Sequence, residues 1–286
     1  MTRLGLAALL LVAACSREEP SPTPTPTPAP TPDLPPHQVF PTAREALDEI
    51  LKSSPRVIGF GEYHQTNDSL GVRSAIKRFT EEMLAALAET GSDLIVETWA
   101  EYGTCGEQEA KVSKDVKKVT ERPPTTENEV LTLLGRAKEL GIAPRVLPFD
   151  CDDYEQLLGK DGEVDYEKLL TLITGKLQTA ATEALARRSR KGRRLIALYG
   201  GSLHNDLYPD EGVADFSYAT KVQEKTAGGY VEVDLYVPEL VAGDKLLAQE
   251  PWYPLLEQRA SIDHVVLFER DKGSYILILK KGVRAD

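Results

Sequence analysis

Residues that can perform acid–base or metal chemistry occur at two matched places in the chain. Gly61-Glu62-Tyr63-His64 follows the apolar run Val57-Ile58-Gly59-Phe60, and Gly201-Ser202-Leu203-His204 follows a second apolar run at residues 195–199. The chain has only four histidines, and two of them stand in this Gly-x-x-His context. A carboxylate and an imidazole in such a place can bind a divalent metal ion or move a proton.

The apolar runs are predicted strands of a parallel sheet, because helical patterns alternate with them. Glu62 and His64 end the first predicted strand, Glu97 the second, Asp150 the third, and His204 follows the fourth. The carboxyl ends of parallel strands lie at one edge of the sheet, where open α/β sheets bind ligands. We therefore expect two imidazoles and up to three carboxylates to converge there.

Such a set can hold a divalent metal ion through His64, His204 and Glu97 and leave a coordination position for water or substrate. Glu62 can then act as the general base on metal-bound water. Taken singly, a carboxylate at a strand end can equally cap a helix or serve a structural hydrogen-bond network. The two matched histidines are what favours a functional site.

These residues must be positioned by the helices and strands around them. The order of the predicted helices and strands indicates an α/β fold with a mostly parallel central sheet flanked by helices, and antiparallel strands at the C-terminal edge. Residues 107–126 are weakly patterned and are expected to be an excursion over the surface. We expect strands at 56–61, 93–97, 145–150, 194–200 and 230–237, then an antiparallel pair at 262–269 and 275–280. We expect helices at 41–52, 70–90, 127–140, 165–190 and 216–226, with an N-cap at Asp165.

The N-terminus has the features of a bacterial lipoprotein signal. Arg3 gives a positive start, residues 4–14 are apolar but too few to span a bilayer, and Val12-Ala13-Ala14-Cys15 resembles a lipobox. The alternative is an ordinary cleaved signal peptide with an incidental cysteine. Ser16 resembles the pattern of outer-membrane sorting. We therefore expect a protein of the bacterial cell envelope, anchored to the outer membrane by lipid on Cys15.

Three parts of the chain follow from composition: a signal peptide at 1–15, a Pro/Thr-rich linker at 16–38 and an α/β domain at 39–286. Proline alternates with Thr, Ser and Ala from Pro20 to Pro36, which favours an extended polyproline II spacer of roughly 50 Å. No other apolar stretch is long enough to cross a bilayer, so the lipid is the expected membrane contact.

The net charge and the absence of several catalytic motifs exclude some classes of ligand and enzyme. The formal net charge is -11, which argues against nucleic acid and against direct adhesion to anionic lipid, and leaves a small-molecule or peptide ligand. The chain has neither a Gly-x-Ser-x-Gly elbow nor a phosphate-binding loop. Gly59-Phe60-Gly61 resembles a dinucleotide fingerprint, but His64 stands where the third glycine belongs.

Cys105 and Cys151 remain once Cys15 is acylated. Each follows a predicted strand, and a bridge between them would close a loop of about 46 residues (151 − 105) and stabilise the fold by roughly 3 to 4 kcal/mol. The alternative is a soft-metal ligand or a nucleophile. Neither cysteine has a CxxC partner or a neighbouring histidine, which favours the disulfide or an inert role.

The Gly-Glu-x-His motif, the glutamate that ends the second strand and the late Gly-x-x-His resemble a superfamily. It groups ChaN-type haem-binding lipoproteins with erythromycin esterases and the Tiki and TraB metalloproteases. The resemblance covers about residues 57–281, and it matches His64 and His204 to the paired histidines. Glu62 and Glu97 match the two glutamates. Arg73 matches an arginine that some members place near the site.

The ChaN-like branch is lipid-anchored, which agrees with Cys15, whereas residues 107–126 and the two later cysteines have no counterpart in the resemblance. Members differ in chemistry, so three functions stay open. The favoured one is a metal-dependent hydrolase with Glu62 and Arg73 in catalysis, because the polar set is acidic as well as basic.

The second function is a haem-binding lipoprotein for iron or haem uptake, in which Tyr63, His64 or His204 would bind the haem. A haem pocket would require more apolar and aromatic walls, and cationic groups for the propionates. The third is a binding module without catalysis.

Overall fold

The computed structural model describes residues 34–187 and 192–282. The predicted signal peptide, Cys15 and most of the predicted linker lie outside the described residues. Leu34–Asp286 forms one compact unit of the chain. Within the described ranges, no helix has the length and apolar character needed to cross a membrane.

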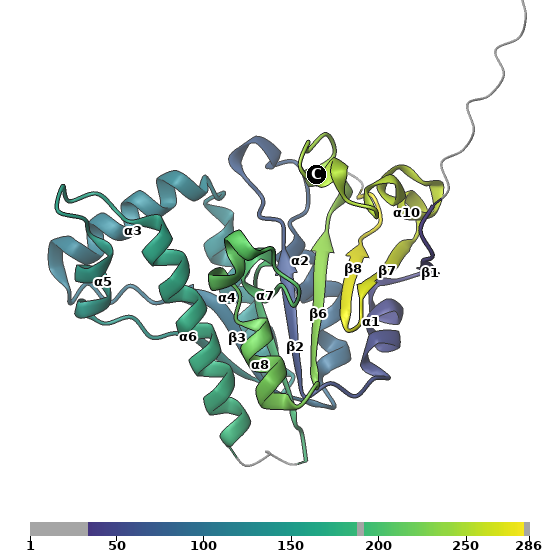
Figure 1. Cartoon of the computed structure of the whole chain (residues 1–286), viewed down its shortest axis with the longest axis horizontal. Helices are drawn as coiled ribbons and strands as arrows, with labels where there is room; N and C mark the ends of the chain where they lie inside the picture. Colours follow the sequence, from purple (N-terminus) through teal and green to yellow (C-terminus); the bar gives the residue numbers. More distant parts are fainter. Residues whose placement is uncertain (1–33, 188–191, 283–286) are drawn as a thin grey trace, which may run out of the picture. The chain divides into compact units, whose positions relative to one another are not determined.

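One eight-stranded sheet runs through this unit, in the order β1-β7-β8-β6-β2-β5-β3-β4 (Figure 1). The β1–β7 and β7–β8 pairs are antiparallel and all the other pairs are parallel. This confirms the fold class predicted from the sequence. The strands are β1 (Gln38–Phe40), β2 (Val57–Glu62), β3 (Gly91–Trp99), β4 (Ala143–Leu147), β5 (Leu195–Gly201), β6 (Tyr230–Tyr236), β7 (Val265–Asp271) and β8 (Ser274–Ile278).

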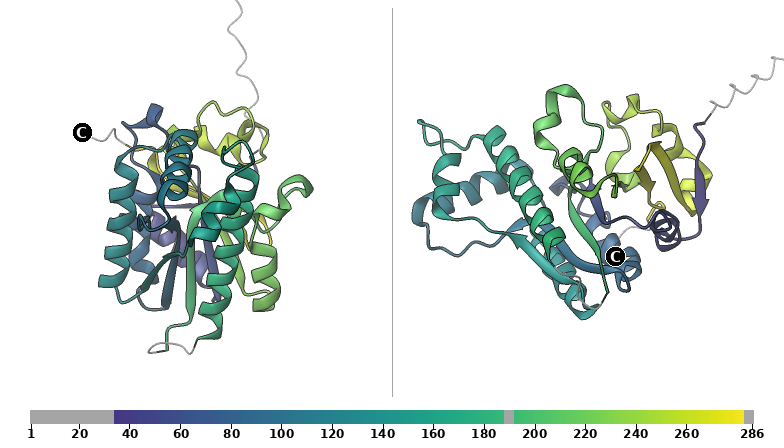
Figure 2. Two further views of the ribbon diagram at one scale, coloured as in Figure 1. Left: turned by 90° about the vertical axis from the view of Figure 1, so that its left-hand side faces the viewer. Right: turned by 60° about the horizontal axis from the view of Figure 1, so that its bottom comes forward.

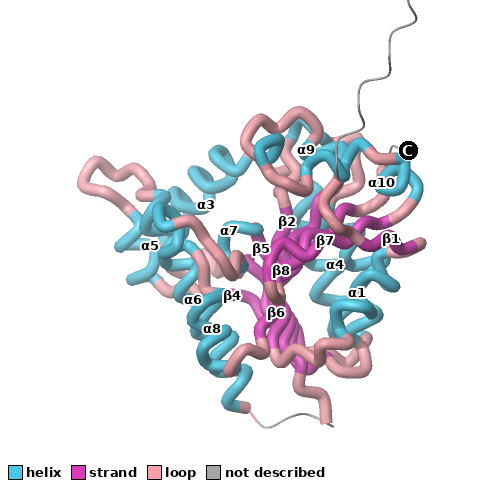
Figure 3. Tube along the Cα trace, turned by 45° about the vertical axis from the view of Figure 1, so that its right-hand side comes forward, coloured by secondary structure: helices cyan, strands magenta, loops and turns pink. Residues whose placement is uncertain are grey.

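Helices cover both faces of the sheet (Figures 2 and 3). On the first face, one hydrophobic cluster joins the strands to α1 (Ala43–Leu51), α2 (Ala75–Arg78) and α4 (Thr125–Glu139). On the second face, another cluster joins them to α3 (Gly106–Thr120), α5 (Cys151–Leu157), α6 (Tyr166–Ala186) and α8 (Ala219–Thr226).

A third cluster covers the second face over β7 and β8. It is built from a segment that contains α9 (Pro238–Val241), the 3₁₀ turns Leu247–Gln249 and Tyr253–Glu257, and α10 (Arg259–Asp263). Smaller elements follow individual strands: the 3₁₀ turn Asn67–Ser69 after β2, and α7 (Ser202–Asn205) and the 3₁₀ turn Glu211–Phe216 after β5.

The connections after β2 and β5 run in opposite directions along the sheet. β2 lies between β5 and β6, and all six of its residues are buried, as expected for a central parallel strand. The chain passes from β2 toward β3 on one side and from β5 toward β6 on the other. The carboxyl ends of β2 and β5 therefore flank a topological switch point, where open α/β sheets bind ligands.

The predicted helix at 70–90 is wrong in its first turn and in its regularity. Gln65 Nε2 donates to the carbonyl oxygens of Ser69 and Val72, at 2.8 and 2.7 Å, and folds this stretch into a loop. Ser74 then caps α2 by accepting from the N–H of Lys77. Beyond α2 the chain continues as a π turn, Phe79–Met83, and a 3₁₀ turn, Leu84–Leu87.

Residues 107–126 contain a regular helix rather than an irregular excursion. Only Glu109, Val112 and Ser113 of α3 are buried, so its apolar stripe is too narrow to be visible in the sequence. Two strand boundaries differ from the prediction by three residues. β4 ends at Leu147 and not at Asp150, and the predicted start of β7 at residue 262 falls within α10.

Candidate functional site

Glu62 and His64 form a hydrogen-bonded pair at the end of β2. Nδ1 of His64 lies 2.8 Å from Oε1 of Glu62, and the hydroxyl of Tyr199 on β5 donates to Oε2 at 2.5 Å. Glu62 is 7% exposed. A carboxylate can only accept, so Nδ1 carries a hydrogen and donates it to Glu62, and Nε2 is the ring nitrogen that remains for other contacts.

Glu97 and His204 form a second pair, from β3 and α7. Oε1 of Glu97 lies 3.7 Å from Nε2 of His204, and Oε2 accepts the backbone N–H of Gly201 at 2.6 Å. His204 is almost completely buried. Its Nδ1 lies 2.9 Å from the carbonyl oxygen of Phe216 and 2.9 Å from the hydroxyl of Thr174. Since the carbonyl can only accept, Nδ1 donates and Nε2 faces Glu97.

Two consecutive glycines let the pairs meet. A Cβ on Gly200 would lie 2.3 Å from Oε2 of Glu97, and a Cβ on Gly201 would lie 2.9 Å from Nε2 of His64. Oε2 of Glu97 would lie 3.6 Å from that same Gly201 Cβ. Gly200 therefore makes room for Glu97, and Gly201 makes room for His64 beside it.

Arg122 completes the site and was missed by the sequence analysis. Its Nη2 lies 2.5 Å from Nε2 and 2.9 Å from Nδ1 of His64. It sits in the loop after α3, where the carbonyl of Glu121 accepts the N–H of Asn67 at 2.9 Å. The only sequence signal is a basic residue before Pro123-Pro124 in a stretch that looked like surface.

Both carboxylates of the site are ionised at neutral pH. Burial raises the pKa of Glu62, but the hydrogen bond and charge of His64, the charge of Arg122 and the Tyr199 hydroxyl outweigh it and leave that pKa lowered. Burial likewise raises the pKa of Glu97, and His204, His64, Arg122 and the Gly201 N–H together lower it. The fold therefore stabilises two negative charges beside two imidazoles.

The predicted metal centre does not fit this arrangement. Among residues 34–187 and 192–282, no three His, Cys, Asp or Glu side chains are placed to hold a metal ion. The physical reason lies at His64, where Nδ1 is bonded to Glu62 and the guanidinium of Arg122 stands against Nε2. A cationic side chain thus occupies the place that the predicted metal ion would take.

Three other predicted residues, Arg73, Asp150 and Tyr63, lie apart from the two Glu–His pairs. Arg73 forms ion pairs with Glu81 and Glu82 and lines a small cavity of about 210 Å³ that contains none of the four site residues. Asp150 is exposed and caps α5 by accepting from the N–H of Asp153 at 3.0 Å, so it is not part of the converging set.

Tyr63 packs against the third hydrophobic cluster, and its hydroxyl donates to Asp244 at 2.9 Å. Burial, then the hydrogen bond and charge of Asp244, raise the pKa of Tyr63. Both effects disfavour the phenolate that an axial tyrosine ligand of haem requires.

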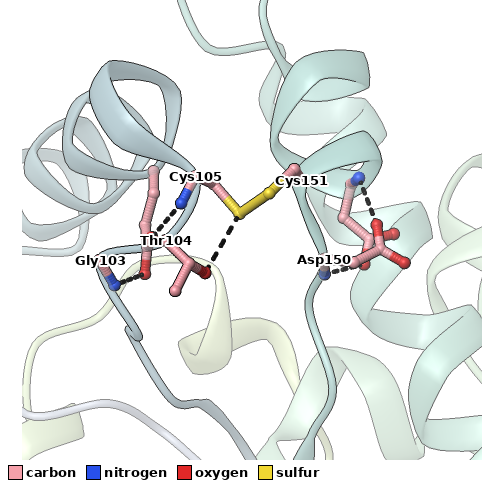
Figure 4. The surroundings of a disulfide bond; sticks show 7 residues. Gly103, Thr104, Cys105, Asp150 and Cys151 are labelled. Carbon is pink, nitrogen blue, oxygen red and sulfur yellow. Dashed lines mark hydrogen bonds between the residues drawn. A yellow bond between two sulfur atoms is a disulfide. The ribbon is translucent and has the colours of Figure 1, made fainter.

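Cys105 and Cys151 are joined by a disulfide (Figure 4). The bridge connects the N-terminal ends of α3 and α5, the elements that follow β3 and β4. Glu109 supports it by accepting the backbone N–H groups of Gly103 and Cys105 at 2.9 and 3.1 Å. A covalent bond thus restrains the helix that leads to Arg122.

A second buried polar cluster lies beside the site, on β6. Asn205, the residue after His204, donates from Nδ2 to Oδ1 of Asp234 at 3.1 Å. Arg270 pairs with Glu232 and Asp206, each at 2.7 Å. Burial and the charge of Glu232 raise the pKa of Asp234 well above its usual range, so this carboxyl favours its neutral form.

No family model matches the sequence, and no curated protein matches it. Two solved structures are similar. The type III effector HopBA1 has a TM-score of 0.44 and 17% identity over 88% of this chain and 99% of that one. A ChaN of Campylobacter jejuni that binds haem cofacially has a TM-score of 0.40 and 13% identity over 87% of this chain and 100% of that one. Both TM-scores are below 0.5, so the functional argument rests on the site itself.

Proposed function

We propose that the protein is a hydrolase in which two Glu–His pairs perform general acid–base catalysis. The observation that carries the proposal is the meeting of the pairs at Gly201, where an added Cβ would lie 2.9 Å from Nε2 of His64 and where the backbone N–H donates to Glu97. Each pair combines an imidazole with an ionised carboxylate, as in other acid–base sites: Glu62 orients His64 through a hydrogen bond, and Glu97 faces Nε2 of His204. The position at the switch point supports the same proposal.

In this reaction His64 acts as the base, because Glu62 holds its Nδ1–H and directs Nε2 toward Gly201. Nε2 takes a proton from water as the water oxygen bonds to the acyl carbon of the substrate, and the π electrons of the carbonyl group move onto its oxygen. When the carbonyl group forms again, the bond from the acyl carbon to the leaving oxygen breaks. His204, held through Nδ1 by the Phe216 carbonyl, gives a proton from Nε2 to the leaving oxygen. Glu97 stabilises the imidazolium form of His204, and solvent exchange restores both imidazoles.

The cellular setting is also a proposal. The lipobox at Cys15 and the proline-rich spacer support a chain anchored by lipid in the bacterial cell envelope, at the outer membrane, acting on a small-molecule or peptide ligand and not on nucleic acid. The Cys105–Cys151 disulfide supports an oxidising compartment. Metabolic labelling with a fatty acid analogue tests the anchor, and equal labelling of Cys15→Ala would contradict it.

The test of the reaction is hydrolysis of a panel of small esters by the purified chain. We expect His64→Gln and His204→Gln each to lower the rate by about 100-fold or more, while circular dichroism and Tm stay near wild type. His264 is exposed, and His264→Gln serves as the matched control with an unchanged rate. Full activity in either site variant would refute the proposal.

Two further measurements separate this reaction from the metal and haem alternatives. We expect dialysis against a chelator to leave the ester rate unchanged. A stoichiometric divalent metal that His64→Gln removes would instead restore the metal-dependent hydrolase. Likewise, a saturable Soret band that weakens in Tyr63→Phe or in a histidine variant would assign the site to haem and contradict the hydrolase.

A further inference from the structure

Arg122 is a half-buried cation whose charge acts on Glu62 and Glu97 without forming a salt bridge to either. Its nearest polar contact in the described part of the chain is the ring of His64, whose Nδ1 donates to Glu62 and whose Nε2 accepts from the guanidinium, and no carboxylate of residues 34–187 or 192–282 forms an ion pair with it. Other partly buried arginines do have such partners: Arg145 pairs with Asp93, and Arg270 pairs with Glu232. In a chain of net charge -11, an unpaired guanidinium at a polar site indicates an external anion.

The backbone, and not a salt bridge, aims Arg122 at the site. Glu121 ends α3 in the left-handed conformation, with φ 47°. The carbonyl of Glu121 is bonded to the N–H of Asn67, and Pro123, the residue after Arg122, is buried. The side chain thus reaches His64 from a fixed backbone, and its guanidinium can rotate onto a ligand without the loss of an existing ion pair.

Charge selects the kind of anion. Glu62 and Glu97 are both ionised beside Arg122, so a phosphate dianion would meet two negative charges for the one positive charge. A monoanion meets less repulsion. A carboxylate also matches the planar fork of a guanidinium, which forms two parallel N–H···O bonds with it.

Resting on the proposed hydrolysis, we propose that Arg122 binds a carboxylate group of the substrate and thereby leaves Nε2 of His64. In the free protein the guanidinium donates to that nitrogen and blocks it as a base. A substrate that carries a carboxylate draws the guanidinium away, and Nε2 becomes available to water. A neutral ester lacks this effect, so the same contact provides both substrate selection and activation.

Binding tests the carboxylate subsite without any reaction. Butanoate and 2-pentanone have the same carbon framework around the carbonyl group, differ by one negative charge and contain no ester bond, and each is titrated into the full chain by calorimetry at constant ionic strength. We expect the monoanion to bind about 10- to 100-fold more tightly, and Arg122→Gln to remove that preference. Arg136 is exposed and pairs with Glu139, so Arg136→Gln is the control that keeps it. Equal binding of both compounds to the wild-type chain would overturn the subsite.

Hydrolysis then separates failure of the subsite from failure of the proposed reaction. The probes are the p-nitrophenyl esters of monomethyl succinate and of succinic acid, of which only the second has a free carboxylate. We expect a higher kcat/KM for the second ester, with the ratio lost in Arg122→Gln and partly kept in Arg122→Lys. Equal turnover of both esters would contradict the subsite while the hydrolase stands. Selective monoanion binding with no turnover would contradict the hydrolase while the subsite stands.

Discussion

The backbone N–H of Gly201 donates a 2.6 Å hydrogen bond to Oε2 of Glu97. This bond ties the end of β5 to the end of β3 and holds the Glu97 carboxylate over two glycines that offer no side chain of their own. The Glu97–His204 pair therefore depends on backbone geometry as much as on the identity of its acid and base.

Gly200→Ala should disrupt the site. The new Cβ would lie 2.3 Å from Oε2 and 2.7 Å from Cβ of Glu97, so Glu97 must move or the strand must shift. We expect a loss of about 1–3 kcal/mol in the free energy of unfolding and a larger proportional loss of ester hydrolysis. Urea unfolding and initial rates measure the two effects. Gly135 in α4 has open space around it, so Gly135→Ala should be neutral or stabilising. A fully active Gly200→Ala would show that Glu97 has no role in the reaction.

Tyr199→Phe should destabilise the protein through Glu62. The variant removes a 2.5 Å hydrogen bond to a buried, ionised carboxylate, and hydrogen bonds to charged groups contribute about 1.5–3 kcal/mol. Because the pKa of Glu62 is lowered in the fold, its stabilising effect is present above the usual glutamate pKa and is lost as pH falls through the lowered value. The difference between wild type and variant should therefore be largest near neutral pH and shrink in acid.

The control is Tyr166→Phe, which removes a bond from the tyrosine hydroxyl to the neutral carbonyl of Asp115. This variant should lower the free energy of unfolding by only about 0.5–1.5 kcal/mol, and the loss should not depend on pH. Equal and pH-independent losses in the two variants would contradict the ionised state of Glu62.

Asp234→Asn should stabilise the protein at neutral pH. The raised pKa of Asp234 means that the folded chain binds a proton that the unfolded chain releases. Stability therefore falls as pH rises from the usual aspartate pKa to the raised one. An asparagine keeps the acceptor for Asn205 without this loss. Unfolding free energies measured from pH 4 to 8 should decline less in the variant.

Asp215→Asn is the control for this effect, because Asp215 is exposed. Its pH profile should follow that of the wild type. Parallel profiles for wild type and Asp234→Asn would indicate that Asp234 is ionised in the fold.

Reduction of the disulfide should lower stability by roughly 3 to 4 kcal/mol, because the bridge closes a separation of 46 residues. Urea unfolding with and without a reducing agent measures the loss. Even without a reducing agent, the double variant Cys105→Ser/Cys151→Ser should have the stability of the reduced wild type. Its unfolding should not change when the reducing agent is added. A response in that variant would place the redox effect elsewhere.

The fold class was predictable because it depends on the long apolar runs of the strands. The apolar sequence of a buried strand such as β2 identifies it as a strand wherever it lies in the sheet. The Gly-x-x-His motifs marked the ends of two strands that lie side by side in the sheet. Glu97 followed from the same rule, since it lies near the end of β3.

Arg122 could not be predicted in this way, because its position depends on a tertiary contact. The bond between Asn67 and Glu121 joins two loops, and no pattern in either stretch specifies that contact. Asp150 was misplaced for a local reason: the strand ends three residues earlier, and an aspartate before a helix serves as its N-cap. The side chain that a loop brings to a site is therefore the least predictable part of it.

The place of β2 in the sheet also determines when the protein can fold. β2 pairs with β5 and β6, and both belong to the last third of the sequence. While the chain is being synthesised, both edges of this buried strand remain unpaired until β5 and β6 have emerged. Such edges are templates for association between chains. We expect truncations that end before Leu195 to aggregate, and production of the protein to depend on chaperones that hold the unfinished chain.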